Sequence, residues 1–302
     1  MPRILNIGSI NIDYVYTVPH FVQAGETLAA ASRQIFLGGK GLNQSVAMAR
    51  AGSVVCHAGM VGNEGVNLLD ILRDAGVDTN LIMQTDSPSG HTIIQVNPEG
   101  ENCILLFPGA NQELDEVFID KAVHGFSEGD MLVLQNEVSC IAYAMQAAKA
   151  KGMRVVFNPS PFGTEIAGYP LGLLDYFLLN ELEGKALTNK NQPGDILKTM
   201  GQLYPDAVIV LTLGEEGVLC LSKGKIFSHK SYKVDVIDTT AAGDTFSGYF
   251  ISSLAEGKDI AEALEIASMA AAISVSRKGA AVSIPDLAEV RSFRNTYASK
   301  WQ

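Results

Sequence analysis

Short apolar runs alternate with helix-like segments along the second half of this sequence, and this alternation limits the possible folds more than any other feature. Strands are predicted at residues 131–134, 154–157, 176–179 and 207–211, with helices at 141–150 and 196–203. Strands separated by helices pair in parallel, and the helices then cover both faces of the sheet. The sequence therefore predicts an α/β fold with a mostly parallel central sheet.

The first part of the chain adds strands to this sheet and predicts a second, smaller sheet. Central strands are predicted at residues 4–10 and 54–61, helices at 42–51 and 66–75, and strands outside the alternating pattern at 14–18, 32–37, 92–96 and 104–107. We expect the segments of about 14–37 and 91–107 to form a small β-sheet lid. The lid and the central sheet would belong to one α/β domain that spans residues 1–302.

The overall charge and the cysteine pattern argue against several classes of protein. With 22 Lys and Arg against 33 Asp and Glu, the chain has a formal charge of −11 and no basic block for a nucleic-acid partner. Its four cysteines form no C-x-x-C pair, which argues against a zinc site. No apolar run is long enough to span a membrane, and the first residues lack the pattern of a signal peptide. We expect a cytoplasmic protein with no membrane partner.

Residues 236–248 combine two acids with a run of very small residues. Asp238 and Asp244 bracket this run, and an apolar segment follows it. If a helix begins near Gly243, its free N–H groups form an anion site that a ligand can approach closely. Asp244 beside that site could accept the proton of a hydroxyl group that attacks a phosphate. The alternative is an ordinary turn in which Asp244 caps the helix.

Two further motifs lie in the N-terminal part. Asn11 and Asp13 alternate along an extended segment, so both could hold hydroxyl groups of one polyol; a solvated turn is the alternative. Residues 38–43 read Gly-Gly-Lys-Gly-Leu-Asn, in which the glycines let the backbone approach a ligand. Lys40 and Asn43 can donate to hydroxyl or phosphate oxygens, and a flexible hinge is the alternative for this motif.

Two other motifs follow predicted central strands, at the edge where open α/β sheets bind ligands. Asn180 and Glu183 could supply oxygen ligands for Mg²⁺, or they could form a capping box at the start of a helix. Residues 212–217 could close over the phosphates of a nucleotide or simply join two strands. The sequence lacks a G-x-x-x-x-G-K-[ST] motif and a G-x-G-x-x-G after its first strand, which disfavours a P-loop kinase and an ordinary dehydrogenase.

In this order and at these separations, the motifs resemble those of the ribokinase-like (PfkB) carbohydrate kinases, and the ribokinase branch in particular. Residues 238–248 resemble the C-terminal signature of the family, residues 38–43 its N-terminal glycine motif, and residues 180–183 its Asn-x-x-Glu motif. The resemblance implies a ribokinase-like three-layer sandwich. It also implies a kinase that transfers the γ-phosphate of ATP to a hydroxymethyl group of a small sugar, with D-ribose as the first candidate.

The resemblance assigns a role to each matching residue. Asp244 would be the base, and the N–H groups of Ala242 and Gly243 would form the anion hole for the transferred phosphate. The sugar would be held by Asn11, Asp13, Gly39, Lys40, Asn43, Glu137 and Asp244. Asn180, Thr212, Gly214, Gly217, Gly243 and Ser268 would face the nucleotide, with Glu183 organising Mg²⁺ through water. K⁺ would be bound by Asp238, Thr240, Ser274, Arg277, Gly279 and Ser283, several of them through backbone carbonyls.

The resemblance also implies that the lid excludes water and pairs with the lid of a second subunit in a homodimer. An exposed sheet needs its edge or face covered, which favours the same arrangement. Leu42 stands where ribokinases commonly have Ala, and His91 and Thr92 stand where their lid is usually apolar. We expect His91 and Thr92 to contact the sugar or the dimer partner, and His91 to be a hydrogen-bonding residue of the lid instead of a second base.

Other functions stay open at this stage. The acceptor could be another pentose, a deoxysugar, a ketohexose or a nucleoside. A regulator that binds a sugar or nucleotide without catalysis is the alternative outside the enzymes. The presence of Asp244, Gly243 and Asn180 argues against it, because a regulator has no need of a base.

Overall fold

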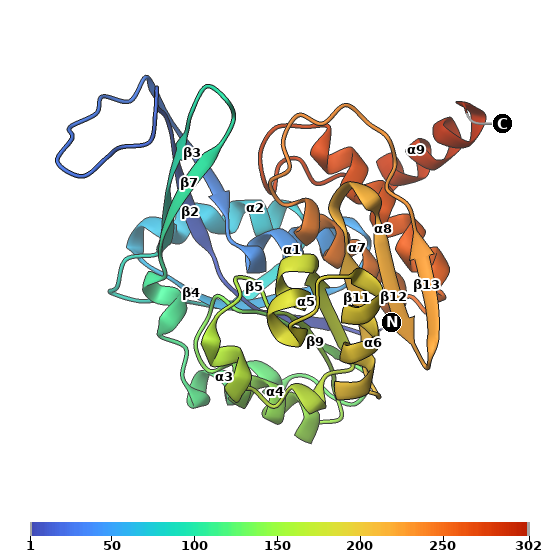
Figure 1. The fold of residues 1–302 in the computed structure, drawn as a ribbon. Helices are drawn as coiled ribbons and strands as arrows, with labels where there is room; N and C mark the ends of the chain where they lie inside the picture. Colours follow the sequence, from blue (N-terminus) through green and yellow to red (C-terminus); the bar gives the residue numbers. More distant parts are fainter. Residues whose placement is uncertain (1, 301–302) are drawn as a thin grey trace.

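The computed structural model describes residues 2–300, except for the side chains of residues 66–68 and 297–300, and it has three layers (Figure 1). In the described chain the central sheet has nine strands, in the order β13 (Lys225–His229), β12 (Val218–Ser222), β11 (Val208–Thr212), β10 (Tyr176–Asn180), β9 (Arg154–Asn158), β8 (Met131–Gln135), β1 (Ile4–Ile7), β4 (Val55–Val61) and β5 (Asp78–Gln84). Neighbours from β11 to β5 pair in parallel, and β12 and β13 form an antiparallel edge. The predicted mostly parallel sheet is confirmed.

Two hydrophobic cores lie on opposite faces of this sheet, because successive side chains of a strand point to opposite sides. Ile4 and Val133 belong to one core, whereas Leu5 and Leu134 belong to the other. The first core is covered by α1 (Lys40–Arg50), α2 (Leu69–Asp74), α7 (Ala242–Ala255), α8 (Ile260–Val275) and α9 (Leu287–Lys300). The second is covered by α3 (Glu116–His124), α4 (Ile141–Ala150), α5 (Glu181–Thr188) and α6 (Pro193–Leu203). The predicted three-layer sandwich is therefore confirmed.

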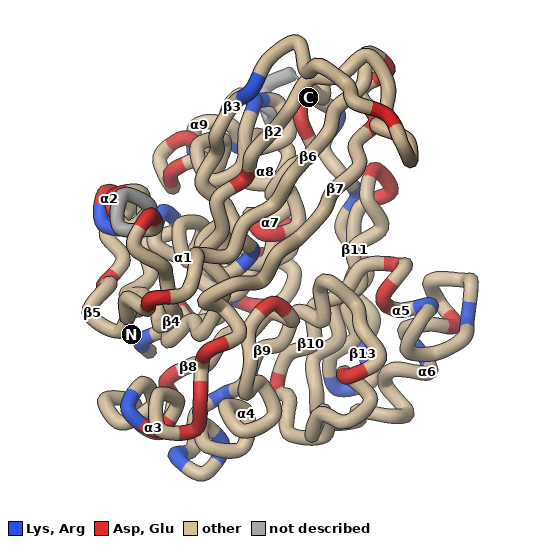
Figure 2. The backbone as a smooth tube through the Cα atoms, turned by 90° about the vertical axis from the view of Figure 1, so that its left-hand side faces the viewer, with Lys and Arg blue, Asp and Glu red and all other residues tan. Residues whose placement is uncertain are grey.

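A separate sheet, here called the small sheet, has four strands in the order β3 (Ser32–Gly38), β2 (Asn11–Thr17), β6 (Gly90–Val96) and β7 (Asn102–Phe107). Figure 1 shows the β6–β7 hairpin and the connection from β2 to β3 projecting beyond the three layers. The side chains of Ile104, Leu105 and Phe107 on its edge strand β7 are exposed. Figure 2 shows the four strands running side by side, and Lys and Arg residues scattered among more numerous acidic residues.

Some predicted boundaries are wrong. Strand β1 ends at Ile7, and Asn11 and Asp13 lie in β2. These two residues are therefore positioned by the small sheet and not by the end of a central strand. The predicted helix 66–75 is a 3₁₀ helix, Asn63–Leu68, followed by the short α2. Strand β5 was not predicted because its sequence, DTNLIMQ, is largely polar and half exposed at the sheet edge. Within residues 2–300, no helix combines the length and apolar character that a membrane crossing requires.

Candidate active site

The residues predicted to hold the sugar gather near the carboxyl ends of β1 and β8. These strands are neighbours, and from them the chain continues toward opposite edges of the sheet, to β4 and β5 on one side and to β9 and β10 on the other. Open α/β sheets bind ligands at such a point, because the loops that leave the two strands diverge. The N-terminal halves of α1 and α7 and the loop after β8 contribute side chains here.

Asp244 lies in the first turn of α7, but it does not cap this helix. The N-cap residue is Ala241, which has φ 59°, and no side chain bonds to the cap. Both carboxylate oxygens of Asp244 instead accept hydrogen bonds from α1, Oδ2 from Asn43 Nδ2 at 3.0 Å and Oδ1 from Gln44 Nε2 at 3.0 Å. The capping interpretation of Asp244 is therefore wrong, and its buried carboxylate is held by two amide groups.

The contact between α1 and α7 explains how these groups meet. A Cβ atom on Gly248 would lie 2.4 Å from Ala47 Cβ and 2.9 Å from Met48 N, so only glycine permits this distance between the helices. Gly248 follows Asp244 by four residues, and Ala47 follows Asn43 by four, so each pair lies on one face of its helix. The close contact at Gly248 and Ala47 therefore places Asp244 against Asn43, one turn away.

The glycines of residues 38–43 are required by contacts within the protein. A Cβ atom on Gly41 would lie 2.4 Å from Ser9 N, and one on Gly38 would lie 2.3 Å from Asp13 Oδ2. Gly39 has φ 95°, a conformation that favours glycine. These glycines, which were predicted to approach a ligand or to form a hinge, also seat the start of α1 against the backbone that follows β1.

Glu137, which follows β8, joins this loop to α1. Its Oε2 accepts hydrogen bonds from Ser9 Oγ and from Lys40 N, the latter at 3.0 Å. Burial raises the pKa of Glu137, although the charge of Lys40 and these hydrogen bonds oppose the rise. Burial alone would lower the pKa of Lys40, but the carboxylates of Asp244, Glu137 and Glu183 outweigh it and raise that pKa. Lys40 is thus a cation among three acids, and Ser9 is a site residue that the sequence analysis missed.

Asn11 and Asp13 enter the site from β2. Asn11 Oδ1 accepts a hydrogen bond from Asn111 Nδ2 at 2.8 Å, and Asn111 is buried and was not predicted. Asp13 Oδ1 accepts from Thr92 Oγ1 at 2.5 Å. Burial raises the pKa of Asp13, and the hydrogen bond from Thr92 opposes that rise. Thr92 therefore belongs with the predicted sugar residues, because it orients one of their carboxylates.

His91 lies in the packing of the small sheet. Its ring centroid is 5.0 Å from that of Phe107 and 6.1 Å from that of Tyr14. Its Nδ1 donates to Ser89 O at 3.1 Å. These contacts agree with the expectation that His91 is a hydrogen-bonding residue of the small sheet and not a second base.

The nucleotide motifs have structural roles of their own. Asn180 and Glu183 form a reciprocal capping box at the start of α5, each bond being 2.9 Å long. Thr212 and Val218 are paired where the antiparallel strands β11 and β12 meet, so residues 212–217 do join two strands. Gly217 has φ 106°, and a Cβ atom there would lie 2.1 Å from His229 O. Nothing lies within 4 Å of a Cβ atom built on Gly214 or Gly243, and Ser268 is buried in α8.

The predicted cation residues form two adjacent groups. Asp238 accepts hydrogen bonds from Thr240 N and Oγ1, at 2.9 and 2.6 Å, and from Gly279 N at 2.9 Å. Burial would raise the pKa of Asp238, but these hydrogen bonds and the charge of Lys278 lower it. Ser274 and Ser283 are buried and bond to each other at 2.8 Å, and Thr245 Oγ1 donates to Ser274 Oγ at 3.3 Å.

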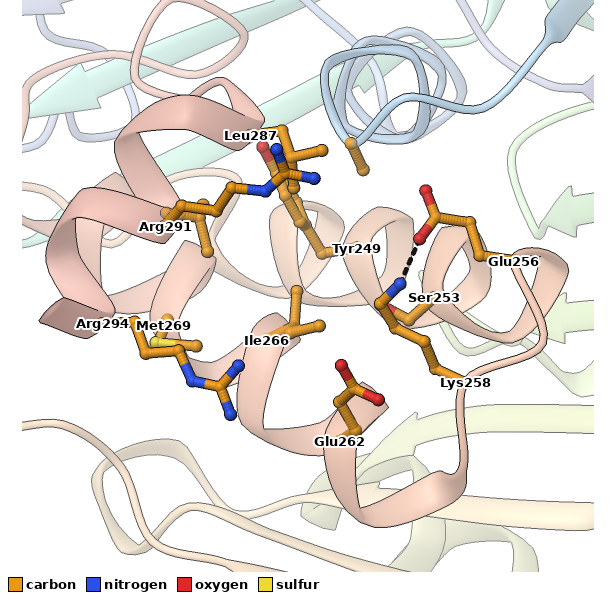
Figure 3. A pocket seen from close by; sticks show the side chains of 12 residues that line it. Tyr249, Ser253, Glu256, Lys258, Glu262, Ile266, Met269, Leu287, Arg291 and Arg294 are labelled. Carbon is orange, nitrogen blue, oxygen red and sulfur yellow. Dashed lines mark hydrogen bonds and ion pairs between the residues drawn. The ribbon is translucent and has the colours of Figure 1, made fainter.

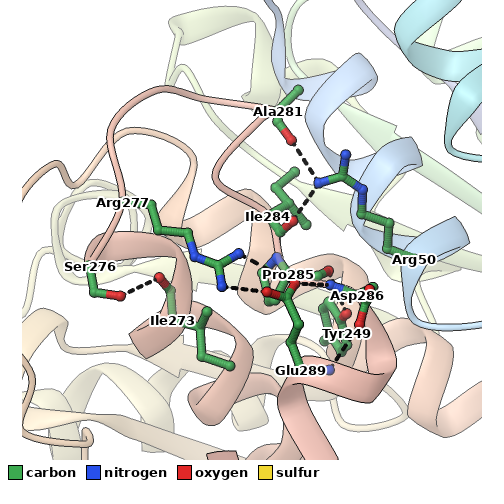
Figure 4. Close-up of polar contacts among 10 residues, drawn as sticks. All are labelled: Arg50, Tyr249, Ile273, Ser276, Arg277, Ala281, Ile284, Pro285, Asp286 and Glu289. Atoms are coloured by element: carbon green, nitrogen blue, oxygen red, sulfur yellow. Dashed lines mark hydrogen bonds and ion pairs between the residues drawn. The ribbon is translucent and has the colours of Figure 1, made fainter.

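The guanidinium group of Arg277 binds Glu289 in α9, so only its backbone is available to a cation (Figure 4). Within residues 2–300, no group of three or more His, Cys, Asp or Glu side chains is placed to hold a metal ion.

A cavity of about 200 Å³ between α7, α8 and α9 lies apart from these groups (Figure 3). Its lining includes Tyr249, Ile266 and Met269, and none of the predicted site residues. Lys258 in its wall pairs with Glu256, and Arg294 pairs with Glu265.

A family model described as "pfkB family carbohydrate kinase" matches residues 1–287 of this sequence. The chain belongs to this family. A ribokinase from Haemophilus influenzae is 38% identical over 296 residues, which cover 95% of this chain and 96% of the relative. A deoxyribokinase from Salmonella typhi is 30% identical, covering 95% and 97%. The structure of Arabidopsis thaliana ribokinase complexed with ribose and ATP has a TM-score of 0.85 and 27% identity, covering 97% of this chain and 98% of that one.

Membership of the pfkB family confirms the resemblance on which the sequence analysis relied. The chain is a carbohydrate kinase that uses ATP, so the regulator without catalysis is not favoured. The roles of individual residues rest on their positions in this structure. Asp244, Asn43, Lys40, Glu137, Asn11 and Asp13 are brought to one place, and Asp238, Thr240 and Gly279 to another.

Proposed function

We propose that this pfkB family member is an ATP-dependent ribokinase, which transfers the γ-phosphate of ATP to the hydroxymethyl group of D-ribose and forms ribose 5-phosphate. The observation that carries the proposal is the buried carboxylate of Asp244, held by Asn43 and Gln44 at the N-terminus of α7. Ribokinases are similar over nearly the whole chain, which favours ribose over a ketohexose or nucleoside.

Asp244 would take the proton of the attacking hydroxyl group. Phosphoryl transfer depends mainly on positioning and charge stabilisation, so one oriented base and a set of donors suffice. Gly243 is exposed, and no other atom lies within 4 Å of a Cβ atom built on it. This space would let a phosphate oxygen reach its N–H. Ala242 N donates to Thr239 O at 3.2 Å, so it would have to release that bond to join the anion hole.

The sugar would be bound between β2 and α1. Asn43 Oδ1 is buried and has no hydrogen-bond partner among the described residues, so it fits a hydroxyl donor of the substrate. Asp13, Asn11, Glu137, Lys40 and the backbone at Gly39 surround the same place. The cation of Lys40 among three acids would stabilise polar groups of the substrate there.

The nucleotide would lie toward Asn180, Thr212, Gly214, Gly217 and Ser268. Mg²⁺ bound to the phosphates would neutralise charge, and Glu183 would act on it through water. K⁺ would bind beside Asp238, whose lowered pKa keeps the carboxylate ionised, with backbone oxygens of the loop 274–283. The small sheet would act as the lid and would pair with a second copy in a homodimer.

An acceptor panel with coupled ADP detection tests the function. We expect turnover of D-ribose at a kcat/KM at least tenfold above that of 2-deoxyribose, other pentoses, fructose and nucleosides, since buried polar groups discriminate missing hydroxyls by about this amount or more. No turnover of D-ribose together with turnover of another acceptor would reject ribose as the substrate. Assays in K⁺, Na⁺ and Tris buffers test the cation, and equal rates in all three would remove the K⁺ site.

A further inference from the structure

Gln44 is fully buried beside Asp244 and has no role in the predicted sugar or nucleotide contacts. Its Nε2 donates to Asp244 Oδ1 at 3.0 Å and lies 3.3 Å from Asn158 Oδ1. Its Oε1 accepts from Gln135 Nε2 at 2.7 Å. Both ends of this amide are therefore engaged inside the protein, unlike those of Asn43, whose Oδ1 is free for a substrate.

The hydrogen bonds continue from Gln135 to a buried histidine. Gln135 Nε2 also donates to Asn6 Oδ1 at 3.0 Å, and Asn6 Nδ2 donates to Ser45 Oγ at 2.7 Å. Ser45 Oγ lies 2.8 Å from His57 Nδ1, and His57 Nε2 lies 3.2 Å from Gly8 O. Asn6, Gln44, Ser45, His57 and Gln135 all have 0% exposure.

The donor and the acceptor of each hydrogen bond in this series are determined. Gly8 O can only accept, so His57 carries its proton on Nε2, and burial keeps the ring neutral by lowering its pKa to about 4. His57 Nδ1 therefore accepts from Ser45, and Ser45 accepts from Asn6. Asn6 Nδ2 also donates to Gly41 O at 2.7 Å, which leaves its Oδ1 to accept from Gln135. Gln44 then presents Oε1 to Gln135 and must turn its NH₂ group toward Asp244.

We propose that Gln44 is a positioning residue for the reaction, which holds Asp244 Oδ1 as a hydrogen-bond acceptor and leaves Oδ2 to receive the proton of the acceptor hydroxyl. Asn43 binds Oδ2 in this structure, but as a predicted sugar residue it can exchange that bond for the substrate. Gln44 cannot turn away without breaking its bond to Gln135. The inference rests on the proposed role of Asp244 as the base.

The role predicts which step of the reaction should change. A donor to a buried carboxylate stabilises and orients it, so removal of the Gln44 amide would leave Asp244 Oδ1 without this partner and slow the proton transfer. The charged groups that also face Asp244 are Lys40 in α1 and Glu137 after β8. Neither contacts Gln44 through a hydrogen bond in the described chain, so both should be unaffected by its replacement.

The test measures single-turnover rate constants and sugar Kd for Gln44→Met and Gln44→Glu, with the sugar that the wild type phosphorylates best. For Gln44→Met we expect a rate constant lower by about 10- to 100-fold, because a small displacement of a catalytic group is that costly. Sugar Kd should change less than threefold, so that the loss lies in the rate and not in binding. Gln44→Glu removes the donor and places a second carboxylate beside Asp244, so it should lower the rate constant further.

Ser252→Ala is the matched control. Ser252 is buried in α7 and donates to Met48 O in α1 at 3.1 Å, so its loss weakens the same pair of helices without reaching Asp244. It should lower Tm but leave the single-turnover rate constant unchanged. Gln135→Met, one bond further from Asp244, should act like Gln44→Met but more weakly, and it replaces that variant if the latter does not fold.

An unchanged rate constant in Gln44→Met would overturn the proposal. So would a raised sugar Kd with an unchanged rate, because Gln44 would then be a binding residue. If ribose is not the substrate, the acceptor panel on the wild type shows it, and the comparison of Gln44→Met with the wild type is still valid with another sugar. Undiminished turnover by Asp244→Asn would instead refute the role of the base itself.

Discussion

The two oxygens of the Asp244 carboxylate accept hydrogen bonds from neighbouring residues of α1. Asn43 donates to Oδ2, and Gln44 donates to Oδ1. Asp244 is 6% exposed, so its carboxylate oxygens need hydrogen-bond donors from the protein when no substrate is bound. At the scale of single residues, the site therefore contains a buried carboxylate with a fixed orientation, which suits the proposed base.

Replacement of Asp244 by Asn should abolish phosphoryl transfer while keeping the fold. The amide has the same shape but cannot accept the proton, so we expect kcat to fall by on the order of 10³-fold. Sugar binding by calorimetry should change little. The control is Asp259→Asn at the N-cap of α8, where Asn caps as well as Asp. Near-normal kcat in Asp244→Asn would mean that another group is the base.

Replacement of Thr92 by Val should weaken the sugar site through Asp13. The hydrogen bond from Thr92 opposes the rise in the pKa of Asp13 that burial causes, so its loss raises that pKa further. We expect kcat/KM for the sugar to fall about tenfold, with its acid limb displaced to higher pH, because a bond to a charged group is lost. Thr17→Val in the same strand as Asp13 should have no effect, and an equal loss in both variants would contradict this role.

At the scale of elements, α1 is held from three sides. Its first turn rests on the backbone after β1 through Gly41, its middle contacts α7 at Gly248, and its last turn carries Arg50. Arg50 Nη1 donates to Ala281 O at 3.1 Å and to Ile284 O, which ties α1 to the loop before α9 (Figure 4). The helix that orients Asp244 is thus also bonded to the loop of the proposed K⁺ site.

Replacement of Gly248 by Ala should separate α1 from α7. The added methyl group would lie 2.4 Å from Ala47 Cβ, so we expect a loss of about 1–3 kcal/mol in the free energy of unfolding from overpacking. The rate should fall as well, because the bonds between α1 and Asp244 lengthen. Gly194→Ala in α6, where nothing lies within 4 Å of the added group, should be neutral or slightly stabilising. Denaturant unfolding measures both, and equal stabilities would refute the steric argument.

At the scale of the whole molecule, the buried neutral His57 should make stability fall in mild acid. Burial lowers its pKa from 6.5 to about 4, so between these values the unfolded chain binds more protons than the folded one. Stability is therefore lost as pH falls from about 6.5 to about 4, by about 3 kcal/mol in total.

The comparison of wild type with His57→Asn measures this effect. The variant should show a flatter fall in Tm between pH 6.5 and 4, although it will be less stable at neutral pH. His124→Asn, at an exposed position at the end of α3, should keep the slope of the wild type. Parallel slopes in all three proteins would show that other groups govern the acid transition.

The small sheet leads to an expectation about assembly. Ile104, Leu105 and Phe107 are 55%, 66% and 48% exposed on its edge strand, which also leaves backbone groups unpaired. If the proposed dimer uses this sheet, Leu105→Glu should raise the dimer dissociation constant at least tenfold in sedimentation experiments. Val117→Glu, equally apolar and 77% exposed but on α3, should leave it unchanged. A wild type that is monomeric at all concentrations would refute the homodimer.

Local patterns in the sequence determined much of this protein. Alternating strands and helices predict the layered sheet, because burial on both faces demands apolar strands. The motifs at 38–43, 180–183 and 238–248 indicated the family and predicted Asp244 as the base, since each needs a specific short run of residues. Their alternatives were also partly right, because Asn180 and Glu183 do form a capping box.

Contacts between distant residues were decided only by the tertiary structure. Asn6, Ser9, Gln44, Asn111 and Gln135 are polar residues inside or beside apolar segments, and no spacing rule relates them. They meet because β1, β8 and α1 converge, across separations such as the 200 residues between Gln44 and Asp244. Likewise, the glycines of 38–43 and Gly248 are explained by close backbone contacts that appear only after packing. A sequence can specify which residues carry chemistry, but the orientation of a buried base is set by the hydrogen bonds that folding brings to it.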